Sequence, residues 1–330
     1  VSMIAHHRFA GIAIACALLP ALVSQSADAQ TPAWPSRFVR LIVPYPAGGG
    51  ADAIARVVGA KLSEIWGQSV GVESRSGAGG NLASEFVARS APDGYTLYLA
   101  GEFQSTNTYL YPKITYDPVA DFTPVSLVVQ YPVAMVVPNS SPAKTVKEFI
   151  AHAKANPGKI TFASPGIGTG PHLAGELFAR VAGVQLTHIP YKGAAPAIVD
   201  LIPGRVDSFF NNIAPVLPLA QQGQVRILAV STAQRAPAAP NVPTIAESGL
   251  PGFDVAGWYA FFVPAKTPPE IVRKMHADTV TALADPKIRG RLEEMGLFVV
   301  GSTPDQLAAY LKSELAKWGP VIRDAGIKVE

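Results

Sequence analysis

Glycine-rich turns that each join a strand to a helix are the feature that most constrains this chain. In the first, an apolar run over residues 38–43 leads into Pro44-Tyr45-Pro46-Ala47-Gly48-Gly49-Gly50, and a helix with one apolar face follows to Trp66. Gly67 is placed to end that helix as a C-terminal cap. Glycines permit positive φ angles and let a ligand approach the main chain closely, while the free N–H groups at a helix start attract anions. One such turn by itself fits a ligand site and a purely structural role equally well.

The same alternation of strand and helix recurs along the chain. A second unit has a strand at 70–73, a glycine turn at 75–81 and a short helix through 82–87, with another strand at 95–99 after it. A third glycine turn, at 164–172, follows a strand at 159–163 and precedes a helix at 173–181. This alternation predicts an α/β fold with mainly parallel sheets. In such sheets ligands bind beyond the carboxyl ends of the strands, where these turns would lie.

The remaining periodic segments predict two lobes. Strands are expected at 125–129, 133–137, 186–189, 206–210, 225–230 and 257–263, and helices at 146–153, 196–201, 269–283, 286–295 and 304–325. We expect residues 30–132 and 257–330 to form lobe 1, and residues 133–256 to form lobe 2, inserted into the first. Glycine turns would then face the space between the lobes from both sides, which favours a ligand site there.

The first 29 residues have the pattern of a secretory signal peptide. Basic and histidine residues at 6–8 precede an apolar stretch over 9–23, and Ala27-Asp28-Ala29 fits a cleavage site, so export with cleavage after Ala29 is expected. A lipoprotein modified at Cys16 is the less favoured alternative, because the apolar stretch continues well beyond that residue. Since Cys16 is the single cysteine, the mature protein should have no disulfide, no thiol nucleophile and no cysteine-bound metal.

Charge and motif content argue against several functions. A formal net charge of +3 with scattered basic residues is not the pattern of a nucleic-acid-binding protein. The chain has no G-x-S-x-G elbow, no H-E-x-x-H pair and no phosphate-binding P-loop, so we expect no enzyme activity, no cofactor and no metal. A hydrolase built from Ser164 or Ser208 with His172 or His188 can be imagined, but the spacing does not support it.

Several side chains near the turns could contact a ligand. His172 could donate an N–H to a carboxylate or cap its helix locally, and Ser164 and Thr169 offer hydroxyls. Asp207 would repel a carboxylate, so pairing with loop amides or a hydroxyl is expected of it. Three aromatic residues could form apolar walls of a site or belong to the core: Tyr45, Phe103 and Tyr191.

A series of segments runs in order along nearly the whole mature chain: 44–49 with Asp52 and Arg56, 77–81, 92–97, 121–125, 146–149, 156–160, 172–174, 190–193, 204–207 and 243–247. Together these segments resemble the exported solute-binding receptors of tripartite tricarboxylate transporters, also called Bug receptors. One departure lies at 102–107, where the family pattern has small and polar residues before the asparagine. Glu102 and Phe103 there could alter ligand choice.

The resemblance implies a two-lobed periplasmic binding protein of the Venus-flytrap kind, type II-like, each lobe a mainly parallel sheet flanked by helices. It implies hinge closure on a small di-, tri- or aromatic carboxylate and delivery to a membrane permease, with a monomeric receptor and no nucleic-acid partner. The ligand contacts that it implies or that the turns suggest are Tyr45, Ala47, Gly48, Gly49, Phe103, Asn107, Ser164, Gly168, Thr169, His172, Tyr191 and Asp207. A ligand-sensing receptor for a signalling partner and an exported hydrolase or lyase of small carboxylates are the alternatives.

Overall fold

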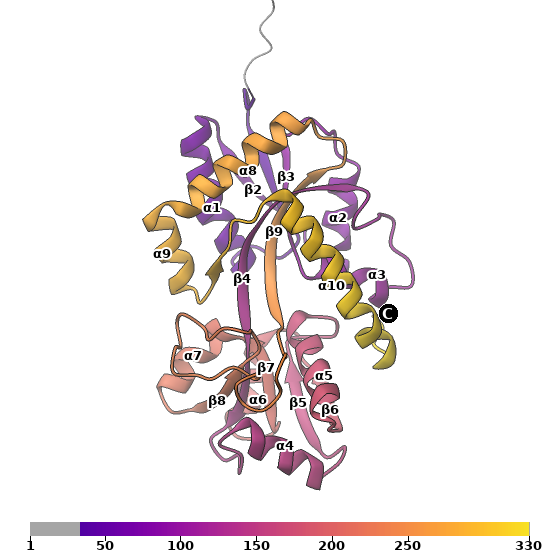
Figure 1. Cartoon of the computed structure of the whole chain (residues 1–330), viewed down its shortest axis with the longest axis vertical. Coiled ribbons are helices and arrows are strands. Elements are labelled where there is room, and N and C mark those ends of the chain that lie inside the picture. Colours follow the sequence, from indigo (N-terminus) through magenta and orange to yellow (C-terminus); the bar gives the residue numbers. More distant parts are fainter. Residues whose placement is uncertain (1–33, 330) are drawn as a thin grey trace, which may run out of the picture. The chain divides into compact units, whose positions relative to one another are not determined.

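Residues 34–329, the part of the chain that the computed structural model describes, are built around a ten-stranded sheet with helices on both faces (Figure 1). The strands lie in the order β2 (Val70–Ser74), β1 (Val39–Val43), β3 (Thr96–Gly101), β9 (Ala256–Pro264), β4 (Phe122–Pro138), β7 (Ser208–Asn212), β5 (Ile160–Ser164) and β6 (Leu186–Pro190). Strands β8 (Val225–Val230) and β10 (Phe298–Val299) also pair with β4. The expected signal peptide over 1–29, with Cys16 and the cleavage site, lies outside the described residues. Pairing divides the strands into a first sheet and a second sheet, which share β4.

The first sheet is parallel at one edge and antiparallel at the other. β1 (Val39–Val43) pairs in parallel with β2 (Val70–Ser74) and β3 (Thr96–Gly101). β9 (Ala256–Pro264) runs antiparallel to β3 and to β4 (Phe122–Pro138), and β10 (Phe298–Val299) also pairs antiparallel with β4. The parallel pairing of β1, β2 and β3 is what the alternation of strands and helices predicts. The antiparallel strand β9 makes the first sheet mixed.

Side chains of the first sheet alternate between two helical layers, as the period of a strand requires. Leu41 belongs to the core beneath α1 (Gly50–Trp66), α8 (Pro269–Ala284) and α9 (Pro286–Glu294). Ile42 belongs to the core on the other face, beneath α2 (Asn81–Ala88) and α10 (Pro304–Asp324). Helix α1 ends at Gly67, which has a φ of 62°, as predicted for its C-terminal cap.

The second sheet repeats this layering. β5 (Ile160–Ser164) pairs in parallel with β6 (Leu186–Pro190) and β7 (Ser208–Asn212), while β8 (Val225–Val230) and β7 run antiparallel to β4. One face packs against α4 (Val146–Ala155) and α5 (Gly170–Ala182). The other packs against α6 (Ala194–Leu201) and α7 (Ile213–Gln221). The two-lobed binding-protein fold expected from the sequence is therefore confirmed, with mixed sheets.

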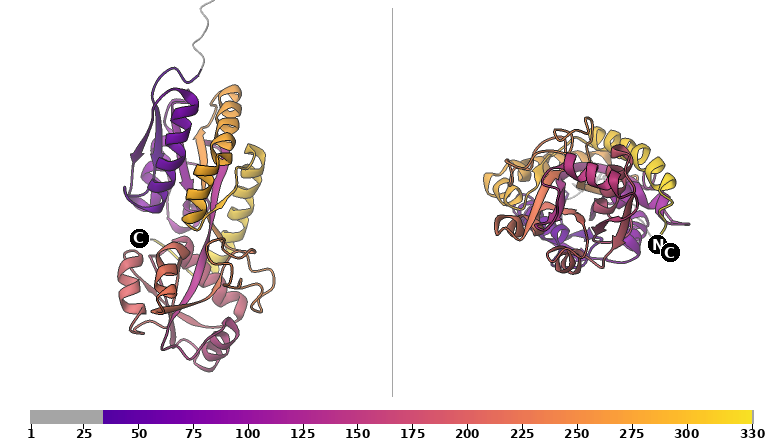
Figure 2. Two further views of the ribbon diagram at one scale, coloured as in Figure 1. Left: turned by 90° about the vertical axis from the view of Figure 1, so that its left-hand side faces the viewer. Right: turned by 90° about the horizontal axis from the view of Figure 1, so that it is seen from below.

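Strand β4 joins the two sheets, and Figures 1 and 2 both show it passing from one into the other. Pro132 is its last residue paired with β9, and Val133 is its first paired with β7. The sequence predicted two separate strands here, whereas the chain forms one continuous strand. The predicted lobe boundary at 132/133 stays a prediction, and this change of partner supports it.

The C-terminal helix contacts the cores of both sheets. Leu307 and Leu311 of α10 pack under the first sheet, while Trp318 and Ile322, two turns further on, share a core with Phe178 under the second. The sequence assigned all of residues 257–330 to lobe 1. The end of α10, which belongs to that lobe, therefore packs on the second sheet.

Two helices were not predicted. Helix α3 (Phe103–Leu110) is largely polar but buried, so its sequence lacks an amphipathic pattern. Helix α7 contains Pro218, which removes a backbone donor and ordinarily interrupts a helix. None of the helices within residues 34–329 combines the length and hydrophobicity needed to cross a bilayer.

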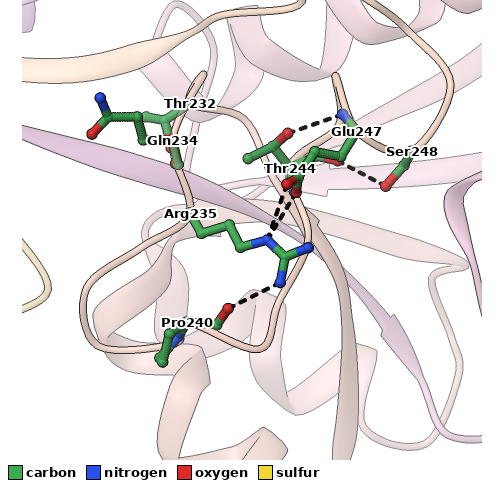
Figure 3. A network of polar contacts seen from close by, with 7 residues as sticks. All are labelled: Thr232, Gln234, Arg235, Pro240, Thr244, Glu247 and Ser248. Atoms are coloured by element: carbon green, nitrogen blue, oxygen red, sulfur yellow. Dashed lines mark hydrogen bonds and ion pairs between the residues drawn. The ribbon is translucent and has the colours of Figure 1, made fainter.

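The long connection from β8 back to β9 is held by a polar network, shown in Figure 3. Arg235 donates from Nε to both Glu247 oxygens, at 3.2 and 2.9 Å, and from Nη1 to the Pro240 carbonyl at 3.1 Å. Thr244 and Glu247 each accept the other's backbone N–H through their side chains, at 3.0 and 2.8 Å. These contacts fix a segment that contains no regular helix or strand.

Candidate functional site

A cavity of about 450 Å³ lies where the glycine turns of the two sheets meet. This volume suits a small organic molecule. The first sheet contributes the ends of β1 and the second glycine turn, the second sheet contributes the third glycine turn, and α3 and the chain's end complete the wall. The lining residues are Pro44, Tyr45, Pro46, Ser76, Gly77, Gly79, Gly80, Glu102, Phe103, Asn107, Leu110, Tyr111, Ile167, Gly168, Thr169 and Val329.

Five of the twelve predicted ligand contacts line this cavity: Tyr45, Phe103, Asn107, Gly168 and Thr169. The other seven are not among its lining residues: Ala47, Gly48, Gly49, Ser164, His172, Tyr191 and Asp207. The second glycine turn was predicted, but its individual lining residues were not. No pattern in the sequence marks Leu110, Tyr111 and Val329, which come to the cavity through the packing of α3 and the chain's end.

The first glycine turn is held from within by Asp52. The Gly48 N–H donates to Asp52 Oδ2 at 3.0 Å, and Arg56 donates from Nε to the same oxygen at 2.8 Å. Hydrogen bonding to Arg56 first, and then to Gly48, lowers the pKa of the buried Asp52 carboxyl. Gly48 has a φ of +83°, which only glycine adopts readily. Asp52 is therefore an acid at a helix start that stabilises the turn, as its position suggested.

Asn107 connects the second glycine turn to helix α3. Its Nδ2 donates to the Gly79 carbonyl and to Asn81 Oδ1, both at 2.9 Å, and Tyr116 donates to the same Asn81 oxygen at 2.8 Å. Asn107 therefore lines the cavity and also fixes the turn that forms one of its walls.

Thr169 and His172 organise the third glycine turn. The Thr169 hydroxyl donates to the Gly166 carbonyl at 2.8 Å and caps α5 by accepting the His172 N–H at 3.4 Å. Gly168 donates its N–H to His172 Nδ1 at 3.0 Å, so the proton of the neutral ring is on Nε2, which faces Glu176 Oε1 at 3.4 Å. The buried His172 ring thus supports the loop from behind.

A second histidine stacks on His172 and raises the question of a metal. His188 lies with its ring centroid 3.8 Å from that of His172, and its Nε2 is 2.7 Å from Ser164 Oγ. Burial, with the neighbouring His172, lowers the pKa of His188 to about 3. Ligand atoms of His172, Glu176 and His188 lie within 4.8 Å of one another. Rings stacked face to face do not direct their in-plane lone pairs at one ion, so this arrangement is not that of a metal centre.

Asp207 and Tyr191 have partners within the second sheet's lobe. Asp207 Oδ2 accepts from the Thr161 N–H at 2.8 Å and from its hydroxyl at 2.7 Å. The Tyr191 hydroxyl donates to Asp200 Oδ2 at 2.8 Å. Asp207 has the pairing with an amide and a hydroxyl that the sequence suggested as an alternative to ligand contact.

Glu102 is the one acidic residue among those lining the cavity. The Tyr131 hydroxyl lies 3.0 Å from both carboxyl oxygens, and a Cβ at Gly170 would come within 3.1 Å of Oε1. Burial raises the pKa of Glu102, against hydrogen bonds from its own amide, from Tyr131 and from the Gly170 N–H, which lower it. The departure from the family pattern at 102–107 was the signal that pointed to this residue.

Two α/β lobes joined by a shared strand, with a ligand-sized cavity lined from both, define the class of bilobal solute-binding proteins. The family model described as the tripartite tricarboxylate transporter family receptor matches residues 54–327. The chain belongs to this family, whose members are receptors and not enzymes.

Similar proteins agree with this assignment. BugT of Bordetella pertussis is 36% identical over 322 residues, which cover 97% of each chain. The structure of R. palustris Rpa4515 with adipate has a TM-score of 0.79 and 37% identity, covering 90% of this chain and 100% of that one. MatC from Rhodopseudomonas palustris with bound malate has a TM-score of 0.75 and 34% identity, covering 88% and 100%.

Proposed function

We propose that the protein is a periplasmic receptor that captures a small carboxylate in the cavity between its glycine turns and delivers it to a tripartite transporter. The observation that carries this proposal is that the cavity has walls from both lobes, formed by residues 44–46, 76–77 and 79–80 on one side and 167–169 on the other. Relatives that resemble this chain over most of its length hold adipate and malate.

The ligand would be held mainly by main-chain groups and small polar side chains. Within residues 34–329, no lysine, arginine or histidine lines the cavity. The apolar part of the wall, with Tyr45, Phe103 and Ile167, suits the hydrocarbon portion of an organic acid. Water bridges would let the same turns accept acids of different shape, because a bridging water is nearly as good as a direct hydrogen bond.

This arrangement favours closure of the two lobes on the ligand. Contacts made to both lobes at once exist only when the lobes are together, so a bound ligand shifts the population toward the closed state. Strand β4, which changes partner at Pro132 and Val133, is one of the covalent links that such a movement would bend. We propose that the closed receptor acts as a monomer, exported with cleavage after Ala29, and docks on the permease subunits of its transporter.

A thermal-shift screen of the protein purified from the periplasm tests the proposal. The panel contains mono-, di- and tricarboxylates, amino acids and aromatic acids, with sugars and phosphate esters as controls. A ligand at about a hundred times its dissociation constant adds roughly 2.7 kcal/mol to the free energy of unfolding, which is readily measured. Stabilisation by carboxylates alone supports the proposal. Stabilisation only by the controls, or no effect from any compound together with no acid detected by mass spectrometry of the denatured protein, contradicts it.

A further inference from the structure

Glu102 places a carboxyl group in a cavity that we propose binds carboxylates. The residue is 9% exposed, and it enters from the end of β3, immediately before α3. The Tyr131 hydroxyl has one proton to donate and lies 3.0 Å from both carboxyl oxygens. That contact, with the Glu102 and Gly170 N–H groups beside the carboxyl group, favours the carboxylate form, whereas burial raises the pKa of Glu102.

Among the described residues, none of the ion pairs involves Glu102. The titratable groups that act on it electrostatically are neutral or acidic: Tyr45, Tyr131, Tyr259, Tyr310 and Glu314. A buried carboxylate without a counter-ion is costly. A positively charged group of the ligand could supply the counter-ion of the Glu102 carboxylate.

Glu102 also contacts the second lobe at the start of α5. Gly170 is the first residue of that helix, and its N–H is one of the donors that have no partner inside the helix. Glycine at 170 leaves the space that the Glu102 side chain occupies, because a Cβ there would lie 3.1 Å from Oε1 and 3.4 Å from the two preceding side-chain carbons. The Glu102 carboxyl group therefore lies against a donor that a ligand carboxylate would otherwise find at this helix start.

We infer that Glu102 makes the cavity selective for carboxylates that also carry an ammonium group, such as ω-amino acids, over dicarboxylates of the same length. One carboxylate of the ligand is held by the glycine turns, and the ammonium group lies beside Glu102. A second ligand carboxylate at that position meets a like charge that already lies against the start of α5. It can bind there only when Glu102 has taken up a proton. This inference rests on the proposed function and specifies its substrate class.

Pairs of acids matched in length test this selectivity. Isothermal titration calorimetry at pH 7.5 compares succinate with 4-aminobutyrate, glutarate with 5-aminopentanoate, and adipate with 6-aminohexanoate. The expected result is at least tenfold tighter binding of the amino acid in one pair. Glu102→Gln keeps the shape and removes the charge, so the preference should shrink to about threefold or less. Glu270→Gln, an exposed carboxylate in the first turn of α8 outside the cavity lining, is the matched control and should keep the full preference.

Proton uptake provides a second readout. Titrations in buffers with different ionisation enthalpies should show uptake approaching one proton per dicarboxylate bound to the unaltered protein, and none in Glu102→Gln. If Glu102→Gln does not fold, Glu102→Ser serves for both measurements. Equal or tighter binding of the dicarboxylates, with a ratio that neither variant changes, overturns the inference and leaves the proposed function intact. Failure of every acid in all the pairs and in the wider screen overturns both.

Discussion

The imidazole rings of His172 and His188 stack with their centroids 3.8 Å apart and their planes 16° from parallel. Phe162 continues the stack, with its ring centroid 4.7 Å from that of His188. The Gly168 N–H donates to His172 Nδ1, and this contact holds the cavity's third glycine turn. Burial beside His172 lowers the pKa of His188, so the neutral form of His188 belongs to the folded arrangement of this wall.

Acid should destabilise the protein through His188. Its folded pKa, about 3, lies below its ordinary value of 6.5, so the unfolded chain binds more protons between these values. The contribution of His188 to the free energy of unfolding is fully present above pH 6.5 and is lost as the pH falls toward 3. At pH 5 this loss is at most about 2 kcal/mol. Urea unfolding at pH 7.5 and 5 should show a smaller loss for His188→Gln than for the unaltered protein.

Thr145→Ala is the control for that measurement. It removes the cap of α4 and no titratable group, and Thr145 is not part of the stack. The control should keep the pH dependence of the unaltered protein. An equal loss of stability at pH 5 in the protein with and without His188 would show that the stacked pair does not cause it.

Much of the fold could be predicted because its signals are local. The strand that leads into α1, the cap at Gly67 and the run of α10 from Pro304 onward each follow from spacing within a few residues. The continuous β4 and helix α7 could not, because both contain prolines that ordinarily end such elements. In β4, pairing with strands of both sheets overrides this local preference. In α7, packing against β8 does so.

The candidate site was predicted less well than the fold. The glycine turns identified which loops meet, but a sequence does not show whether a group in a loop points into the cavity or supports it from behind. Ser164 and His172 support the third turn, while Ile167 beside them lines the cavity. Val329 reaches the cavity from the end of the chain, through a hydrogen bond to the Leu110 carbonyl, and no local pattern marks such a contact.

Thr169→Ala should weaken both folding and ligand binding. The variant loses the cap of α5, which costs about 1 kcal/mol of stability, and it frees the loop that the hydroxyl holds through Gly166. Thr145→Ala removes the corresponding cap of α4, where the Thr145 hydroxyl accepts the Glu148 N–H at 3.2 Å, away from the cavity lining. Both variants should unfold at lower urea, but calorimetry should find weaker binding only for Thr169→Ala. Equal affinity of the two variants for the ligand would show that Thr169 does not contribute to the binding site.

Asp207→Ala should affect stability without affecting the ligand. The carboxylate accepts two hydrogen bonds from Thr161, so its removal leaves a partly buried backbone donor unpaired, at a cost of about 1–3 kcal/mol. Because Asp207 does not line the cavity, the dissociation constant of a bound acid should remain within about twofold of its original value. A large loss of affinity at a temperature where the variant is fully folded would return Asp207 to the set of ligand contacts.

Gly170 and Glu102 should be coupled, because a side chain at 170 and the glutamate need the same space. Gly170→Ala should cost more stability in the unaltered protein than in a Glu102→Ser background, with a coupling of about 0.5–3 kcal/mol in the double-mutant cycle. Pro171 restricts the backbone of any non-glycine residue before it, but this cost is the same in both backgrounds and cancels. Urea unfolding of the four proteins gives the coupling directly. Additive effects would mean that the Glu102 carboxyl group does not rest against the start of α5.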